Sequence, residues 1–331
     1  MRIAFCCDLH FTAKNEIRII EGLNFLEYIF DYCVKNNIPN LVLGGDIFHT
    51  SNSIKNQAFV PVFMKLYEMS KKLHIYVIPG NHDIMNNDND CLAETFSAFS
   101  TFIKKSATID IDGIPCDFLA YTEDTSDIPN NGRILFSHLE IEGFYFNSKK
   151  KVENSIFTES LFENYELVVS GHLHKMQERN NFLFVGSPYE TDRGEMGKSN
   201  YFAVINGEPN REITYELVSY EEAPKYMTID VEQFNEDLDF SNKMITIRIN
   251  KKIENFVKLR DIMFNKGCIS VEPEFIKEDT PVDVGIHNIS STESVSVGMA
   301  KYLKEVKSEG IDNNKLLGYY KKVLKSMSEC L

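Results

Sequence analysis

Aspartate, asparagine and histidine residues recur in this sequence directly after short apolar runs. Asp8 and His10 follow residues 3–5, and Asp46 follows residues 41–43 and two glycines. The same pattern recurs at Asn81, His82, Asp83, His138, His172 and His174. Carboxylate and imidazole groups together suit manganese, iron or zinc better than calcium, and burying such a cluster without a cation would be costly. These residue types therefore indicate a metal site.

Two pairs have a spacing that suits binding of one ion by both members. Asp8 and His10 are two residues apart, and so are His172 and His174. In an extended chain, residues i and i+2 project to the same side. Each pair can therefore share a cation. A lone histidine would be better explained as a core or surface residue, but these residues are grouped.

The segments that must position these side chains have the pattern of strands. Residues 41–43 are typical of a strand buried on both faces, and Gly44 and Gly45 let the backbone turn tightly before Asp46. Comparable apolar runs precede the other polar groups. We therefore expect five strand ends to converge on one pole of the fold.

Helices and hairpins are predicted between these strands. Apolar spacing predicts a helix over 17–34 and another over 54–73, in which Pro61 must begin a new helix or kink the old one. Asp112-Gly113 and Asn206-Gly207 are typical of hairpin turns. Parallel strands that give way to antiparallel ones predict an α/β sandwich of two packed sheets.

The pattern changes from about residue 224. Alternation at 243–249, helical spacing at 253–264 and an extended run at 268–275 predict a small α+β unit. A polar linker follows, and then two predicted amphipathic helices. The predicted helices are 295–307 and 315–328, and the predicted domains are 1–218 (catalytic), 219–280 (α+β) and 285–331 (a helical pair).

Composition limits the class of protein. A length of 331 residues predicts two or three domains at ~150 residues each. The formal net charge of −14 argues against a uniformly basic nucleic-acid binder. Residues 285–331 differ from the rest, because seven lysines against five acidic residues give them a net charge of +2. Metal ions would reverse the sign locally in an acidic cleft.

Cysteine usage and hydropathy indicate the compartment. The seven cysteines include no Cys-x-x-Cys pair, and the amino terminus lacks the pattern of an export signal. Apolar runs stay well below the ~18 residues of a membrane helix. We therefore expect a cytoplasmic protein that does not enter a membrane, with thiols serving as small core residues.

The ordered motifs resemble a known signature. Asp8-x-His10, Gly45-Asp46, Gly80-Asn81-His82-Asp83, Ser137-His138 and Gly171-His172-x-His174 are similar to the blocks of the calcineurin-like metallophosphoesterases, over roughly residues 1–190. The resemblance implies an α/β/β/α sandwich with two divalent metal ions, Mn²⁺ first and Mg²⁺ or Fe²⁺ as alternatives. It implies that Asp8, His10, Asp46 and His174 hold one ion, and that Asp46, Asn81, His138 and His172 hold the other.

The same resemblance assigns His82 a role in catalysis. It implies that His82 is not a metal ligand, and that it contacts the phosphate or protonates the leaving oxygen. The alternative is that His82 only orients a neighbouring ligand.

Three features resemble the nuclease branch of that family. They are His49 in Gly-Asp-Ile-Phe-His, the loop 186–191 after an apolar strand, and the α+β unit followed by a helical tail. This order is similar to that of the DNA-capping and ATPase-binding segments in the double-strand-break repair nucleases of the SbcD type, which implies DNA capping for 219–280. The length of the chain is similar to that of phage recombination nuclease subunits. The resemblance implies a DNA exonuclease and endonuclease, with His49 at the catalytic site and DNA contacts at Ser187, Tyr189 and Arg193.

The nuclease branch also implies partners. They are DNA, a second copy of the chain, and an SMC-like coiled-coil ATPase of the SbcC type bound through 285–331. Three alternatives remain open from the sequence. The enzyme could act on a small molecule or a phosphoprotein, it could be an inactive metal-bound scaffold, or the tail could simply pack on the catalytic domain.

Overall fold

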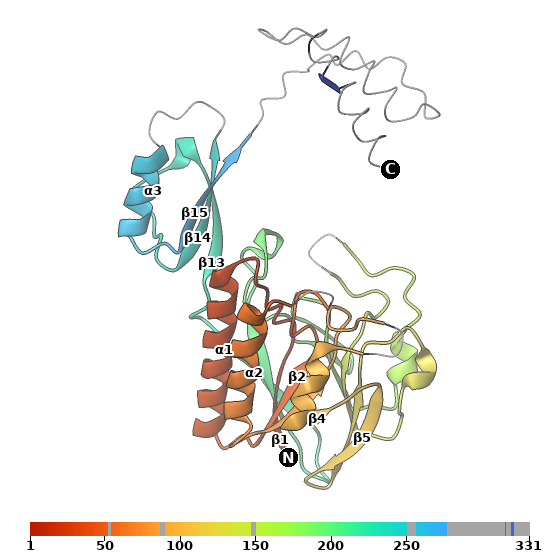
Figure 1. The fold of residues 1–331 in the computed structure, drawn as a ribbon. Helices are drawn as coiled ribbons and strands as arrows, with labels where there is room; N and C mark the ends of the chain where they lie inside the picture. The colour runs from red at the N-terminus through yellow and green to blue at the C-terminus, as the bar shows by residue number, and fades with distance from the viewer. Residues whose placement is uncertain are drawn as a thin grey trace, which may run out of the picture. The chain divides into compact units, whose positions relative to one another are not determined.

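The computed structural model describes residues 1–51, 54–86, 90–146, 150–249, 256–276, 315 and 319–320. Residues 1–274 form one compact unit. Within this unit two six-stranded sheets pack against each other, and helices α1 and α2 lie side by side along the first sheet (Figure 1). The predicted α/β fold with two packed sheets is confirmed.

The first sheet is mainly parallel. Its strand order is β12-β11-β1-β2-β3-β4. Strands β1 to β4 run parallel, whereas β11 pairs antiparallel with β1 and β12 pairs antiparallel with β11. The bounds are β1 Arg2–Cys6, β2 Asn40–Gly44, β3 His74–Ile78, β4 Thr101–Phe102, β11 Tyr201–Asn206 and β12 Thr214–Ser219.

The second sheet begins with a hairpin. Its order is β5-β6-β7-β8-β10-β9. The β5–β6 turn is at Asp112-Gly113, where both residues have positive φ, as predicted. By contrast, the Asn206-Gly207 turn is not a tight one, because β12 resumes only at Thr214. The bounds are β5 Ser106–Ile111, β6 Ile114–Leu119, β7 Ile134–His138, β8 Leu167–Gly171, β9 Gln177–Arg179 and β10 Phe182–Phe184.

Local sequence explains where the two long helices begin and end. Helix α1, Glu16–Lys35, starts at Asn15, whose side chain accepts a hydrogen bond from the Ile17 N–H at 3.0 Å. Helix α2, Asn56–Met69, contains Pro61 in its second turn, so no new helix begins there. The helix runs on through Pro61, which costs it one backbone hydrogen bond. The 3₁₀ segments are η1 Leu92–Ala98, η2 Thr125–Asp127, η3 Glu159–Phe162, η4 Arg193–Glu195 and η5 Val231–Gln233.

Alternation along the strands builds the core. In β1, Ile3 and Phe5 belong to the apolar cluster between the sheets, whereas Ala4 belongs to the cluster under α1 and α2. The rings of Phe5 and Phe136 stack across the sheets at 6.0 Å. The sandwich therefore fixes the ends of the strands rigidly with respect to one another.

A third, smaller sheet has the order β13-β14-β15, with β13 parallel to β14. Its buried residues include Ile229, Ile247 and Met263. The strands and helix are β13 Lys225–Asp230, β14 Lys243–Ile249, α3 Phe256–Asn265 and β15 Ser270–Phe275. The domain boundaries stay predictions, and the predicted helices 295–307 and 315–328 lie outside the described residues, apart from 315 and 319–320.

A buried charged network links α1 to β13. Arg18 and Glu21, both almost fully buried, form an ion pair in α1. Arg18 Nη2 donates to the Tyr226 hydroxyl at 2.5 Å, and the Tyr226 backbone N–H donates to Glu190 Oε2 at 2.6 Å. The network therefore ties the first strand of the small sheet to the catalytic fold. Among the described residues, none of the helices has the length and apolar character needed to cross a membrane.

Candidate metal centre

The predicted ligands lie where the strands end. Asp8 and His10 follow β1, Asp46 follows β2, and His172 follows β8. All four residues have positive φ, between 47° and 82°. This backbone conformation is uncommon for residues other than glycine and clusters at functional sites. The chain therefore turns sharply at each strand end and directs these side chains to one place.

Asp46 lies at the middle of the centre. Its Oδ2 atom is 3.5 Å from His10 Nε2, and its Oδ1 atom is 3.4 Å from His138 Nε2. Oδ1 also accepts a hydrogen bond from the His82 backbone N–H at 2.9 Å. The two carboxylate oxygens of Asp46 therefore face two different histidines.

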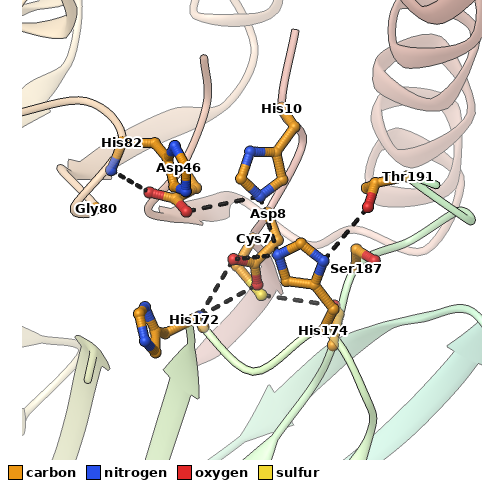
Figure 2. A network of polar contacts seen from close by, with 12 residues as sticks. Cys7, Asp8, His10, Asp46, Gly80, His82, His172, His174, Ser187 and Thr191 are labelled. Atoms are coloured by element: carbon orange, nitrogen blue, oxygen red, sulfur yellow. Dashed lines mark hydrogen bonds and ion pairs between the residues drawn. The ribbon is translucent and has the colours of Figure 1, made fainter. Parts of the chain in front are cut away.

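One group of possible ligands lies on the His10 side of Asp46. The Nε2 atoms of His10 and His174 are 2.9 Å apart, and His174 Nε2 is 3.7 Å from Asp8 Oδ1 (Figure 2). Asp8, His10 and His174 have ligand atoms within 4.8 Å of one another. These three side chains therefore point into a single space.

A second group lies on the His138 side. Asn81 Oδ1 is 3.2 Å from His138 Nε2 and 2.9 Å from His172 Nδ1. His138 Nδ1 donates to the Gly44 carbonyl at 2.8 Å, so Nε2 is the ring nitrogen that is directed at Asp46 and Asn81. Asp8, Asp46 and His138 also bring ligand atoms within 4.8 Å of one another.

The donor chemistry fits divalent cations. The ring nitrogens of His10 and His174 face each other, and at most one of them can carry the proton of a neutral pair. Nδ1 of His10 is buried without a hydrogen-bond partner. Carboxylates and imidazoles that converge in this way are costly to bury unless a cation compensates them. The residues present therefore suit metal ions on both sides of Asp46.

The pKa values of the ligands are shifted by burial and by neighbouring charges. Burial raises the pKa of Asp46, but His138 and His10 outweigh it and hold that pKa well below its ordinary value. Burial lowers the pKa of His138, but Asp46 raises it overall to about 9. Burial, together with the charge on His138, lowers the pKa of His172 to about 3. The carboxylates therefore attract positive charge into the centre.

Two glycines let the backbone approach the ligands. A Cβ at Gly45 would lie 2.2 Å from His138 Nδ1, and φ at Gly45 is +97°. A Cβ at Gly80 would lie 2.2 Å from Asp46 Oδ1. Both positions therefore require glycine for the ligands to pack as they do.

A comparison with known proteins decides the family. Residues 1–176, more than half of the chain, match the model described as calcineurin-like phosphoesterase. The chain belongs to that family. The family uses a dimetal site, which agrees with the two groups of ligands around Asp46.

Similar proteins include a phage nuclease subunit. Exonuclease subunit 1 of Enterobacteria phage T4 is 22% identical over 317 residues, which cover 88% of this chain and 90% of the relative. Putative phosphoesterase 244L of Invertebrate iridescent virus 6 is 25% identical over 277 residues, covering 78% and 93%. A solved dimetal phosphatase from Danio rerio is 10% identical with a TM-score of 0.41, covering 66% and 95%, and that score supports no inference.

In this phosphoesterase, His49 and His82 lie together beside the group of possible ligands that contains His10. Their rings stack at 5.6 Å, and His82 Nδ1 donates to the His49 carbonyl at 2.9 Å. His82 lines a cavity of about 390 Å³, whereas His49 is exposed and its ring stacks on that of His82. The other lining residues include Asp46, Asn81, Phe146, His172, His174, Asp192 and Glu195.

The three predicted DNA contacts differ in exposure. The Tyr189 ring is buried under α1, and its hydroxyl donates to the Leu9 carbonyl at 2.5 Å. Ser187 is also buried, and its hydroxyl donates to the Tyr189 carbonyl at 3.0 Å. Neither side chain is exposed in this structure, and their contacts with DNA stay predictions. Arg193 is exposed, paired with Glu272 at 2.6 Å, and stays a prediction.

The structure gives Asp83 a role that the sequence motif did not reveal. Asp83 is buried and accepts hydrogen bonds from the backbone N–H groups of Ile47 at 3.2 Å, Phe48 at 3.0 Å and Gly80 at 3.0 Å. It therefore joins the loop after β2 to the loop after β3. In the sequence, the only sign of a role for Asp83 is its place in the Gly80–Asp83 block.

Sequence reasoning also missed the residues behind His172 and His174. Glu195 contacts Nδ1 of His174, and Glu140 Oε2 is 3.4 Å from Nε2 of His172. Glu195 is 21 residues from His174 along the chain, so no local motif connects the two.

Proposed function

We propose that this phosphoesterase is a two-metal-dependent DNA phosphodiesterase, with exonuclease and endonuclease activity, that processes DNA ends in recombination and repair. The observation that carries the proposal is the arrangement of Asp46, whose two oxygens face His10 on one side and His138 on the other. Similarity to a protein named as an exonuclease subunit, over most of both chains, supports DNA as the substrate.

In this proposal, Asp8, His10, Asp46 and His174 hold one ion, and Asp46, Asn81, His138 and His172 hold the other. Two divalent ions bound there supply Lewis acidity and a hydroxide nucleophile at neutral pH. The positive φ angles and glycine contacts hold the side chains in place before substrate arrives. Mn²⁺ is the proposed metal, because mixed carboxylate and imidazole ligands suit it.

His82 acts on the leaving group in this proposal. Its Nδ1–H is committed to the His49 carbonyl, so only Nε2 can contact the phosphate or, when the ring is in its imidazolium form, give a proton to the leaving oxygen. Its backbone N–H binds Asp46, which fixes the ring beside the ligands. His49, at the exposed edge, helps to place a duplex end.

A second candidate is hydrolysis of a small phosphate ester. Asp192 lines the cavity as an exposed carboxylate, which is unfavourable for a polyanion such as DNA. One relative is named only as a putative phosphoesterase. These observations favour a compact substrate.

An assay on several substrates distinguishes the two candidate functions. Purified protein in Mn²⁺ should be assayed on linear duplex DNA, on single-stranded DNA, on bis-p-nitrophenyl phosphate and on p-nitrophenyl phosphate. We expect cleavage of DNA and of the diester, with little action on the monoester. Rapid hydrolysis of the monoester with intact DNA would instead establish the second candidate.

The proposed partners are a second copy of the chain and an SMC-like ATPase bound through 285–331. The support is the relative's printed name, which calls it a subunit, and the net charge of +2 on that segment in an acidic chain. Deleting 285–331 is expected to leave a metal-loaded enzyme with basal activity that no longer co-purifies with the ATPase. Full binding and full response to ATP by the truncated protein would contradict this assignment.

A further inference from the structure

Glu195, the last residue of η4, is surrounded by donors. Its side chain is 12% exposed. Oε1 contacts Nδ1 of His174 and accepts from the Thr191 hydroxyl at 2.8 Å. Oε2 accepts from the Thr191 backbone N–H at 2.7 Å and from Lys198 Nζ at 2.6 Å. Four donors therefore hold both oxygens of one carboxylate against a proposed metal ligand.

This contact fixes the tautomer of His174. A carboxylate oxygen only accepts, so Nδ1 must carry the proton in a hydrogen bond to Glu195. Nε2 is then left with a lone pair, and Nε2 is the atom that faces His10 and Asp8. An imidazole whose second nitrogen donates to a carboxylate is a more basic and better oriented ligand.

Lys198 stabilises the arrangement from behind. Its ammonium group contacts Glu195 Oε2, donates to the His174 carbonyl at 3.1 Å, and also contacts Ser187. The side chain is 11% exposed. One lysine therefore offsets the buried negative charge of Glu195 and also holds the backbone of the ligand that Glu195 contacts.

The other histidine of the motif has weaker support. Glu140 Oε2 is 3.4 Å from His172 Nε2, and the Glu140 side chain is 36% exposed. His172 Nδ1 faces Asn81. The two histidines are only two residues apart in sequence, but the carboxylate behind His174 is closer to its histidine and more deeply buried.

We propose that Glu195, supported by Lys198, is a positioning residue that sets the affinity of the metal position formed by Asp8, His10, Asp46 and His174. This inference rests on the metal ligands of the proposed function and adds a residue outside the family motif. It makes the two metal positions unequal, because the carboxylate behind His174 is 12% exposed whereas the one near His172 is 36% exposed.

The test is a titration of Mn²⁺ into the full-length, metal-free protein, in which binding is measured by calorimetry and by electron paramagnetic resonance. In Glu195→Gln the amide N–H₂ group can donate to His174 Nδ1, which would move the ring proton to Nε2 and block the ligand atom. We expect the Kd of one of two Mn²⁺ ions to rise about 10- to 100-fold, the scale for loss of a carboxylate behind a ligand. The other Kd should stay unchanged. Catalytic activity should recover as Mn²⁺ is raised to saturation.

The matched control is Glu272→Gln, which removes the same charge near η4 but contacts Arg193 and not His174. It should titrate like the wild type. Glu195→Asp should recover part of the affinity for Mn²⁺. If Glu195 has a purely structural role, Glu195→Gln should lower the melting temperature of the metal-free protein without changing Mn²⁺ binding. If Glu195→Gln does not fold, Lys198→Met tests the same support, with an expected rise in that Kd of about tenfold.

Two outcomes separate this inference from the proposed function. Unchanged binding of both ions in folded Glu195→Gln and Lys198→Met would overturn the inference and leave the nuclease proposal intact. The opposite outcome has two parts: the wild type binds two Mn²⁺ ions, one of which is weakened by Glu195→Gln, and it cleaves no DNA. That outcome would overturn the nuclease proposal and support the inference.

Discussion

Two parts of this molecule bury charge, and they do so in different ways. In the metal centre, carboxylates and imidazoles converge from separate strand ends, and two imidazole nitrogens face each other at 2.9 Å. In the network on α1, Glu21 is buried beside Arg18, which also binds Tyr226. The converging ligands of the first region include no lysine or arginine, whereas the second region contains the guanidinium group of Arg18.

The difference shows which region serves function and which serves structure. A cluster of ligands that repel one another costs stability unless a metal is bound, and proteins retain such clusters at functional sites. A buried ion pair with a hydrogen-bonded tyrosine carries its own countercharge and needs no bound ion. Substitutions in the first region should therefore change metal binding and catalysis, and those in the second should change stability.

The largest effect is expected for Asp46→Asn. An amide keeps the size of the side chain but removes the charge that both metal groups face, so DNA cleavage should fall at least about 10³-fold, the scale for losing a strong electrostatic stabiliser. Metal content should fall at both positions. Elemental analysis and a nuclease assay check these two points, and a melting curve of the metal-free variant checks that it is folded. Full metal content and normal cleavage in Asp46→Asn would contradict the assignment of this region to metal binding and catalysis.

The next effect concerns Glu21 and pH. Burial raises the pKa of Glu21 from 4.5 to about 7, although Arg18 opposes the shift. Because the folded pKa is the higher one, the stabilising contribution is full below pH 4.5 and is lost as pH rises through 7. The free energy of unfolding should therefore fall by roughly 3 kcal/mol between pH 4.5 and 8 from this group. Glu21→Gln should lack that fall.

Urea denaturation in EDTA at several pH values measures this dependence. Glu27→Gln is the matched control for loss of charge, since Glu27 is an exposed carboxylate on the same helix. DNA cleavage by Glu21→Gln should match the wild type wherever both proteins are folded. An identical pH dependence in the wild type and in Glu21→Gln would show that Arg18 fully compensates the buried carboxylate.

Much of the centre could be predicted because its determinants are local. An apolar strand followed by Asp46 or by His172-x-His174 is visible as a pattern, and parallel strand ends must meet at one edge of a sheet. Glu195 could not be predicted, because its contact with His174 depends on the path of a loop. The resemblance of the loop 186–191 to the nuclease branch gave Tyr189 as a DNA contact, but it could not reveal that the large ring is buried against Phe25.

A smaller loss is expected for His82→Ala. The bond from its backbone N–H to Asp46 survives the substitution, so both metals and DNA binding should be retained. Cleavage should fall by about 100-fold, the scale for loss of general acid catalysis. Single-turnover cleavage and metal analysis on the same sample measure the two quantities. Loss of metal in parallel with activity would make His82 a residue that only orients the ligands.

The smallest effect is expected for His49→Ala, which separates the edge of the site from its centre. The His49 carbonyl, which anchors His82 Nδ1, is backbone and remains in the variant. Only the exposed ring is lost, so chemistry at the metals should be little changed. If that ring places a duplex end, cleavage of duplex ends should fall about tenfold, the scale of one hydrogen bond to a charged group, with a smaller loss on single strands. His74→Ala is the control, since His74 is an exposed histidine that begins β3 at the end of the strand opposite Asn81. Equal losses on duplex and single-stranded DNA would assign His49 to support of His82 and not to substrate choice.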